Sequence, residues 1–200
     1  MIDVAVTSKS FNGKPVLGKV NFHVDPGEVV VVLGPSGIGK STLLRIVAGI
    51  DDRYEGTVRT VGPLAMVFQE PTLLPWRSVA ENLTLIHPGL SEDGVSEALA
   101  QVGIPDKARD FPGQLSLGQQ RRVALARAFA MTPRVLILDE PFASLDEVTA
   151  EEMLTLTERL IARARPATLF VTHSQTEAAR LGTRILRLSG SPATLDEVSA

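Results

Sequence analysis

Residues 34–41, with the sequence GPSGIGKS, fit the pattern G-x-x-x-x-G-K-[ST] at every fixed position. They follow the all-apolar run 29–33, which predicts a strand covered on both faces, and they precede a predicted helix over 41–48 that Gly49 closes. Glycines allow consecutive backbone N–H groups to turn around phosphate oxygens, and the start of the helix aims its positive end there. The pattern predicts a phosphate-binding turn between a strand and a helix. The simpler alternative is a glycine-rich turn with a solvated lysine.

The residues that we expect to bind the phosphates of ATP in and beside this loop are Gly34, Pro35, Ser36, Gly37, Ile38, Gly39, Lys40, Ser41 and Thr42. Lys40 is expected to reach the β- and γ-phosphates and to act in catalysis, and the Ser41 hydroxyl is expected to ligate Mg²⁺. The loop alone leaves the reaction open, because kinases, GTPases, helicases and transport ATPases all use it.

Two carboxylates follow a second apolar run, residues 135–138, as Asp139 and Glu140. In a parallel α/β sheet, ligands lie at the carboxyl ends of the strands, where the phosphate loop also lies. Asp139 is then placed to hold Mg²⁺, and Glu140 to orient or deprotonate the water that attacks the γ-phosphate. A glutamate directly after the metal-binding aspartate favours ATP hydrolysis over phosphoryl transfer to another substrate. The alternative is a pair of acids that only solvates a strand end.

Composition narrows the class of protein. The 200 residues suit one domain, and 44% hydrophobic with 22% charged residues is typical of a soluble globular protein. The net charge of -3 provides no overall positive field for nucleic acid. The sequence has no cysteine, which excludes disulfides, thiolate zinc sites and a cysteine nucleophile. No apolar run approaches the roughly 18 residues of a membrane span, so a role at a membrane requires other subunits.

The order of the predicted elements indicates an α/β core that is interrupted by helices. The dipeptide Asn12–Gly13 predicts a hairpin, and the alternation over residues 20–24 predicts a half-buried strand of an antiparallel sheet. Further strands are predicted at 4–8, 56–61, 64–68 and 169–171. Between Ser78 and about Ala130 the apolar residues have helical spacing, as in Val95, Ala98, Leu99 and Val102, and a later helix face carries Met153, Leu156, Leu160 and Ala164.

The segment 115–128, LSLGQQRRVALARA, resembles the signature of ATP-binding-cassette (ABC) ATPases, which reads Leu-Ser-Gly-Gly-Gln before a helix rich in arginine and alanine. With the phosphate loop before it and the acidic strand end after it, the resemblance covers nearly the whole chain. It implies an α/β fold: a P-loop NTPase core with a mainly parallel central sheet, an antiparallel β subdomain and a helical insertion. Residues 1–200 would then form a single ABC ATPase domain, with a helical subdomain inserted at about 72–130.

In this family the signature binds the γ-phosphate held by the other protomer, so that two ATP molecules are sandwiched between two ATPase subunits. The resemblance implies that Ser116, Gly118 and Gln119 act in this way, as befits hydroxyl and amide donors at a helix start. A capped amphipathic helix alone would explain Ser116 but not the whole string. Leu117 departs from the family, which has glycine there; its N–H remains, but its β-carbon restricts the loop conformation.

Four further residues take roles that only the resemblance implies. Gln69 matches the glutamine that contacts Mg²⁺ and the attacking water and links to the membrane subunit. Asp146, in Ser-Leu-Asp, matches a short loop that crosses the dimer interface; the alternative is a helix N-cap. His173 matches a histidine placed against the γ-phosphate; the alternative is an ordinary histidine at a strand end. Phe11 matches an aromatic that stacks on adenine, although Phe22 and a plain core role compete for this assignment.

Residues 70–82, EPTLLPWRSVAEN, are similar to a stretch of bacterial importers of the nitrate, sulfonate, taurine and thiamine-precursor group. The resemblance implies that Trp76 lines a groove where a transmembrane permease subunit docks; the alternative is a tryptophan buried under a proline-rich loop. It further implies a second ATPase subunit, a solute-binding protein in the full system, no nucleic-acid partner, and a peripheral place on the cytoplasmic face of the plasma membrane.

Two other functions stay open at this point. One is a cassette ATPase without a transport role, acting in translation or DNA repair. The other is a cassette that binds ATP as a structural clamp without hydrolysis, although intact Lys40, Asp139, Glu140 and His173 speak against it.

Overall fold

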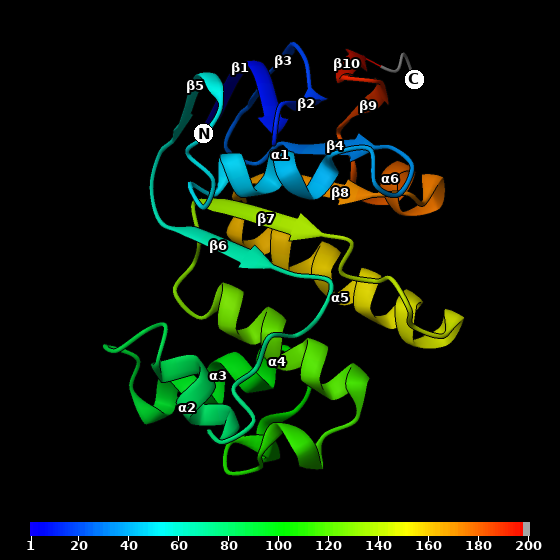
Figure 1. Ribbon diagram of the computed structural model, residues 1–200. Coiled ribbons are helices and arrows are strands. Elements are labelled where there is room, and N and C mark those ends of the chain that lie inside the picture. The colour runs from blue at the N-terminus through cyan, green and yellow to red at the C-terminus, as the bar shows by residue number, and fades with distance from the viewer. Residues whose placement is uncertain (198–200) are drawn as a thin grey trace. The chain divides into compact units, whose positions relative to one another are not determined.

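The computed structural model describes residues 1–197, which divide into two compact units (Figure 1). The first, here called the sheet unit, comprises Met1–Met66, Arg134–Glu140 and the described chain from Arg165 onward. The second, the helical unit, comprises Val67–Pro133 and Pro141–Ala164.

The described residues form one sheet of ten strands, in the order β3-β1-β2-β10-β9-β4-β8-β7-β6, with β5 paired to β1. The strands are β1 (Ile2–Phe11), β2 (Lys14–Leu17), β3 (Val20–Val24), β4 (Val29–Leu33), β5 (Glu55–Thr60), β6 (Leu64–Val67), β7 (Val135–Asp139), β8 (Ala167–Thr172), β9 (Arg184–Gly190) and β10 (Ala193–Glu197). Strand β4 pairs in parallel with β8 and β9, and β7 pairs in parallel with β8. Strand β1 is antiparallel to β2, β3 and β5, and β9 is antiparallel to β10.

The central strands are parallel and lack alternation because both of their faces are covered. Every residue of β4 and β8 is buried, and in β7 only the terminal Asp139 is half-exposed. The register pairs Leu33 with Thr172 and Asp139 with Val171. The carboxyl ends of β4, β7 and β8 therefore meet at one edge, and the loops that follow them share that edge.

The antiparallel part contains the predicted hairpin. Asn12 and Gly13 join β1 to β2 with φ values of 50° and 76°, the left-handed geometry that this dipeptide favours. The predicted strands near 56–61 and 64–68 exist as β5 and β6, but they belong to different regions of the sheet, since β5 pairs with β1. Strands β9 and β10 were not predicted; the burial of β9 is irregular, so its sequence lacks a clean period of two.

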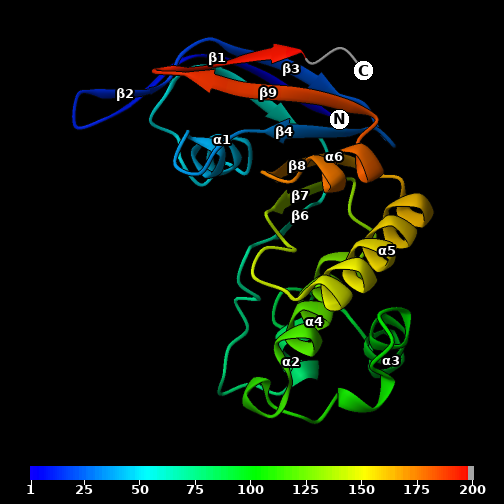
Figure 2. The same ribbon diagram turned by 90° about the vertical axis from the view of Figure 1, so that its right-hand side faces the viewer.

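Helix α1 (Lys40–Val47) contacts both β5 and β7, and thus lies between the antiparallel and parallel parts of the sheet (Figures 1 and 2). Its buried face includes Leu43, Leu44 and Ile46, and these join a core that contains apolar residues of β1, β3, β4, β7, β8 and β9. Gly49 follows the helix with φ 71°, as a helix-ending glycine does. Helix α6 (Gln175–Leu181) contacts β4 and β8.

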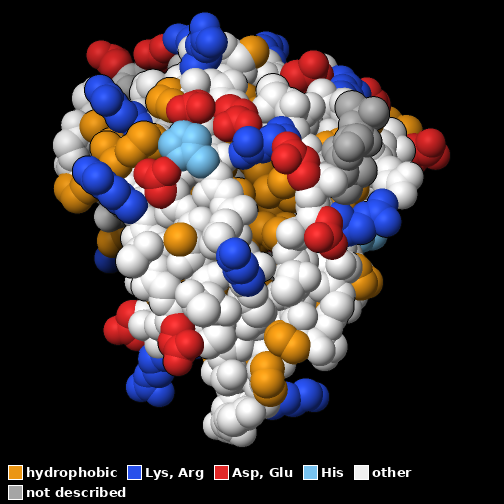
Figure 3. All heavy atoms as spheres, turned by 90° about the horizontal axis from the view of Figure 1, so that it is seen from above, with side chains coloured by type: hydrophobic (Ala, Val, Ile, Leu, Met, Phe, Trp, Pro, Cys, Tyr) orange, Lys and Arg blue, Asp and Glu red, His pale blue; other side chains and the backbone are white. Residues whose placement is uncertain are grey.

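The outer face over the antiparallel strands carries charges of both signs, interspersed (Figure 3). This agrees with the net charge of -3.

The helical unit contains α2 (Val79–Thr84), α3 (Glu92–Gln101), the short 3-10 helices η1 (Pro105–Lys107) and η2 (Pro112–Gln114), α4 (Leu117–Phe129) and α5 (Glu147–Ala164). Helix α4 contacts α2, α3 and α5 and so forms the centre of the unit. Of the eight residues that the sequence places on these apolar helix faces, Ala164 is half-exposed and seven are buried in α3, its C-cap and α5: Val95, Ala98, Leu99, Val102, Met153, Leu156 and Leu160. Within residues 1–197, no helix combines the length and apolarity needed to cross a membrane.

Candidate functional site

The phosphate loop lies where β4 ends and α1 begins. Gly39 has φ 115°, and a β-carbon at that position would lie 2.9 Å from Leu17 Cδ2, so the loop approaches β2 too closely for a side chain. A hollow of about 370 Å³ opens beside the loop, lined by Gly34, Pro35, Ile38 and His173 together with residues of β9 and Gln175. The backbone thus bends around a space large enough for part of a ligand.

The Lys40 ammonium group lies inside this loop, with only 4% of the side chain exposed. It donates hydrogen bonds to the carbonyl oxygens of Gly34, at 2.8 Å, and Pro35, at 3.0 Å. It also lies 3.0 Å from Glu140 Oε1. A buried cation is therefore fixed between the loop and the acidic strand end.

Glu140 is held in an unusual conformation between two basic groups. Its φ is 44°, a left-handed value that costs a non-glycine residue about 1–3 kcal/mol and recurs at functional sites. Its N–H donates to the carbonyl of Val171 at 3.0 Å, and its Oε2 lies 2.8 Å from His173 Nδ1. Burial raises the pKa of Glu140, but hydrogen bonds with Lys40 and His173 outweigh burial and bring the pKa below its usual value. The carboxylate is thus kept ionised and able to accept a proton.

Asp139 and Ser41 form a pair of oxygen donors next to this group. Ser41 Oγ lies 3.3 Å from Asp139 Oδ1. Burial raises the pKa of Asp139 and exceeds the lowering effect of Ser41 and of nearby cations. Burial thus disfavours the ionised form of the Asp139 carboxylate, and a bound cation would stabilise that form.

The turn that carries His173 is braced by residues that sequence reasoning missed. Thr172 Oγ1 donates to Glu177 Oε2 at 2.5 Å and accepts a bond from the Ser174 N–H at 3.0 Å. Burial raises the pKa of Glu177. Nothing in the sequence separates this glutamate from other helix-surface acids, because its partner becomes evident only when α6 folds back on β8.

In the helical unit, the predicted signature residues open α4. Ser116 Oγ accepts a hydrogen bond from Gln119 N at 3.2 Å, and Gln119 Oε1 accepts one from Ser116 N at 3.0 Å, which is a complete capping box. Leu117 is the first helical residue, with 46% of its surface exposed. A helical backbone accepts any L-residue, so the β-carbon of Leu117 imposes no strain here. The restriction that the β-carbon of Leu117 imposes is therefore compatible with the described conformation.

The loop that follows Glu140 caps the next helix. Asp146 Oδ1 accepts a bond from Thr149 N at 3.0 Å, and hydrogen bonds from Thr149 lower the pKa of Asp146. Thr149 also lies close to the signature, since a β-carbon on Gly118 would be 3.3 Å from Thr149 Cγ2. The starts of α4 and α5 are thus neighbours within the helical unit.

The remaining predicted residues are exposed. Gln69 lies in the bend after β6, and Trp76 is 70% exposed, so the interpretation of Trp76 as a buried core residue is wrong. Phe11 is 46% exposed at the end of β1, with Lys9 Nζ 4.4 Å from its ring centroid. Phe22 instead packs against the core of the sheet unit.

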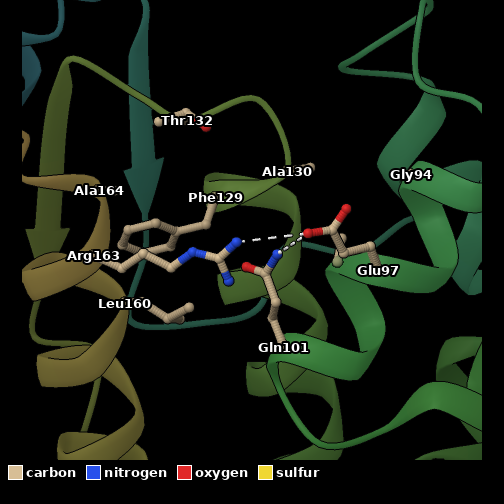
Figure 4. A pocket seen from close by; sticks show the side chains of 10 residues that line it. Gly94, Glu97, Gln101, Phe129, Ala130, Thr132, Leu160, Arg163 and Ala164 are labelled. Atoms are coloured by element: carbon tan, nitrogen blue, oxygen red, sulfur yellow. Dashed lines mark hydrogen bonds and ion pairs between the residues drawn. The ribbon is translucent and has the colours of Figure 1, made fainter.

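A separate cavity of about 250 Å³ lies among α3, α5 and the end of α4 (Figure 4). At its rim Glu97 accepts a bond from Gln101 Nε2 at 3.2 Å and lies 3.6 Å from Arg163. The two charged side chains are both 67% exposed, so their attraction is weak. None of the predicted site residues lines this cavity.

The sheet unit therefore brings together Lys40, Ser41, Asp139, Glu140 and His173 from three separate stretches of sequence. A glycine loop at a helix start, an oxygen-donor pair and an ionised glutamate are the parts of a site that splits a nucleoside triphosphate with water. Fold and site define a P-loop ATPase.

The chain belongs to the ABC transporter family, whose model matches residues 17–143. It is 42% identical over 197 residues to the aliphatic sulfonates import ATP-binding protein SsuB 3 of Rhodococcus jostii (strain RHA1), a match that covers 98% of this chain and 74% of the relative. It is 45% identical over 190 residues to SsuB 2 of Rhizobium johnstonii (strain DSM 114642 / LMG 32736 / 3841), covering 94% and 76%.

A solved structure supports the same assignment. The dimeric, post-hydrolysis state of the ATP-binding cassette MJ0796, bound to ADP and Pi, superimposes with a TM-score of 0.84 at 27% identity, over 100% of both chains. The predicted fold class and the predicted ATP-hydrolysing transport subunit are confirmed.

Proposed function

We propose that this chain powers the import of a small organic anion of the sulfonate class through separate membrane subunits. The observation that carries its ATPase chemistry is Glu140, held ionised between Lys40 at 3.0 Å and His173 at 2.8 Å. Support for the cargo comes from the relatives, which are named as import proteins for aliphatic sulfonates.

In this proposal Glu140 accepts the proton of the attacking water, and His173 contacts the γ-phosphate and keeps the Glu140 carboxylate oriented. Lys40 would exchange its carbonyl partners for β- and γ-phosphate oxygens, which are stronger acceptors for an ammonium group. The N–H groups of the loop from Gly34 to Thr42 bind the remaining phosphate oxygens. Phe11, exposed at the end of β1, stacks on the adenine ring.

The residues present fit Mg²⁺. Ser41 and Asp139 offer hard oxygen ligands, and the burial of Asp139 disfavours its charge until a cation is near. Among the described residues no three His, Asp or Glu side chains could by themselves hold a metal ion. The oxygen-donor pair of Ser41 and Asp139 suits Mg²⁺, which retains waters and takes substrate phosphates as ligands and would neutralise phosphate charge when bound. Gln69 would add an amide oxygen.

The second ATPase subunit is expected to be another copy of this chain. The related MJ0796 cassette is dimeric. In the capping box Ser116 Oγ accepts a hydrogen bond, so its own O–H remains able to donate. The Gly118 N–H belongs to the first turn, where backbone donors have no partner within the helix. Ser116, Gly118 and Gln119 would thus bind the γ-phosphate held by the partner, with Asp146 close to the same interface.

The helical unit provides the surface for the permease. Trp76 is 70% exposed a few residues after Gln69, and Leu85 and Ile86 are 52% and 58% exposed. In this proposal these exposed aromatic and aliphatic side chains contact the membrane subunit. Residues 1–200 would act as one cassette with its helical part at about 72–130, peripheral to the cytoplasmic face of the plasma membrane. A solute-binding protein would deliver the anion.

Two measurements test this function. Purified chain should hydrolyse ATP, and a strain that lacks the gene should lose uptake of a labelled alkanesulfonate, restored by the parental chain but not by Lys40→Ala. Membrane subunits should co-purify with the native complex. Normal alkanesulfonate uptake in the deletion strain refutes the cargo, and co-purified ribosomes or DNA in place of membrane subunits refute the transport role.

A further inference from the structure

Arg127 of the signature helix holds the loop that follows Gln69. Its guanidinium group donates hydrogen bonds to the carbonyl oxygens of Pro71, at 3.0 Å, and Thr72, at 2.9 Å. It also donates to the Thr72 hydroxyl at 2.9 Å. Three bonds from one planar group to two consecutive residues fix both the position and the orientation of that loop.

The held loop has a conformation that it would not adopt readily alone. Thr72 has φ 49°, and a β-branched residue at positive φ is a genuine outlier. Thr72 is itself exposed, so burial of its side chain does not account for the conformation. Arg127 binds this strained residue through both its carbonyl and its hydroxyl, which indicates that the arginine maintains the loop geometry.

Arg127 is also anchored through its backbone. The carbonyl oxygen of Arg127 accepts a hydrogen bond from His87 Nε2 at 2.8 Å, which ties the last turn of α4 to the segment after α2. Helix α4 runs without interruption from Leu117 to Phe129, and most of its residues from Val123 onward are buried. A rigid helix of this length would carry a displacement of its capped start at Ser116 to Arg127.

A second arginine of α4 makes a comparable contact nearer the start of the helix. Arg121, 6% exposed, donates to the carbonyl oxygens of Pro141 and Ala143, both at 2.5 Å. The loops that follow Gln69 and Glu140 are thus each attached to α4 by an arginine. Only the first of them leads to the exposed Trp76.

We propose that Arg127 is a positioning residue that joins the signature helix to the loop between Gln69 and Trp76, so that ATP-driven movement of α4 reaches the Trp76 surface. This inference rests on the proposed function, in which Ser116 and Gly118 meet the ATP of a second copy. Arg127 itself touches neither nucleotide nor permease in this scheme.

Trp76 provides the readout, because it is the one tryptophan in the sequence and lies four residues after Thr72. The chain of residues 1–200 with Glu140→Gln is titrated with Mg-ATP while tryptophan emission and its quenching by acrylamide are recorded. We expect the tryptophan emission of the chain that carries Glu140→Gln alone, here called the parent, to change on ATP addition. In Arg127→Lys the change should be lost while ATP binding, followed with a fluorescent nucleotide, is retained, since an ammonium group cannot form the three-bond fork.

Arg122→Lys is the matched control. Arg122 lies on the same helix and is also half-buried, but it donates to the Val102 carbonyl at 3.0 Å and lies 2.8 Å from a Glu152 oxygen. It should keep the tryptophan response. Thr72→Ser, which retains the hydroxyl and the carbonyl, should keep it as well.

Three outcomes overturn the inference. One is an Arg127→Lys variant that responds like the parent. Another is parental chain that binds ATP and dimerises without any change at Trp76; the proposed function survives both of these. The third is an Arg127→Lys variant that fails to fold in a melting experiment, which would make the arginine structural. A parental chain that binds no ATP removes the proposed function together with the inference.

Discussion

His173 Nδ1 lies 2.8 Å from Glu140 Oε2, and the two residues follow the adjacent parallel strands β8 and β7. The Glu140 carboxylate receives Lys40 on its other oxygen at 3.0 Å. Both oxygens of this carboxylate are thus occupied by basic groups, so one of these contacts has to give way before Glu140 accepts a proton in the proposed role as general base.

The first prediction concerns Glu140→Gln. The variant should bind ATP but hydrolyse it about 10²–10⁴ times more slowly, because an amide cannot accept the proton of water. Steady-state ATPase assays beside nucleotide titrations measure the two effects. Glu92→Gln removes the same charge from an exposed position of α3 and should retain parental turnover. Near-parental turnover in Glu140→Gln would exclude Glu140 as the base.

The second prediction concerns assembly through Ser116. In the Glu140→Gln background, ATP should convert monomers to dimers in light scattering, and Ser116→Arg should prevent the conversion by crowding the partner's phosphate. Ser91→Arg is the matched control, since Ser91 caps α3 in the same way through Gly94 N at 3.1 Å. Both substitutions remove a helix cap worth about 1 kcal/mol. A loss of dimerisation that came only from this destabilisation would therefore appear in both variants. A Ser116→Arg chain that still dimerises with ATP contradicts the assignment.

The third prediction concerns Trp76→Ala. Because Trp76 is 70% exposed, the free energy of unfolding of the isolated chain should change by no more than about 0.5 kcal/mol, and ATP binding should persist. Association with the membrane subunits should weaken by roughly 2 kcal/mol or more, the range of an aromatic anchor, and transport should fall with it.

Ile50→Ala serves as the control for Trp76→Ala, since Ile50 is 62% exposed on the sheet unit. It should co-purify with the membrane subunits like the parent. The docking assignment would be contradicted if the Trp76→Ala chain unfolds, or if it co-purifies with the membrane subunits as well as the parent does.

The fourth prediction concerns pH and His23. Its Nδ1 lies 2.5 Å from Asp3 and its Nε2 2.9 Å from Asp25, so both ring nitrogens donate only in the imidazolium form. Hydrogen bonds to Asp25 and then Asp3 raise the pKa of His23 above its ordinary value of 6.5. A raised pKa in the folded state gives stability that is complete below pH 6.5 and is lost as the pH rises through the folded value.

Urea unfolding over a series of pH values measures this effect. The free energy of unfolding of the parental chain should decline above pH 6.5, and His23→Gln should flatten that decline. Equal slopes in parent and variant would show that His23 titrates alike in both states.

Much of the fold follows from local sequence. The all-apolar segments at 29–33 and 135–138 became buried parallel strands, and Asn12–Gly13 became a hairpin turn. The pairing of strands was harder to predict from the sequence. Strands β5 and β6 follow one another but do not pair, and the hairpin of β9 and β10 was missed. Strand neighbours depend on which apolar faces meet after the chain has collapsed, and that information is not contained in any one segment.

The sequence by itself determined the phosphate loop and the acidic pair, because each is a run of adjacent residues whose backbone geometry creates the chemistry. Only the tertiary structure decided that Lys40 and His173 lower the pKa of Glu140, that Trp76 is exposed and that Arg127 binds Thr72. The Arg127–Thr72 contact joins residues 55 apart, and Glu140 meets His173 across 33. Charge state, exposure and long-range hydrogen bonds arise from what packs around a group, and a side chain acquires those neighbours only when distant segments come together.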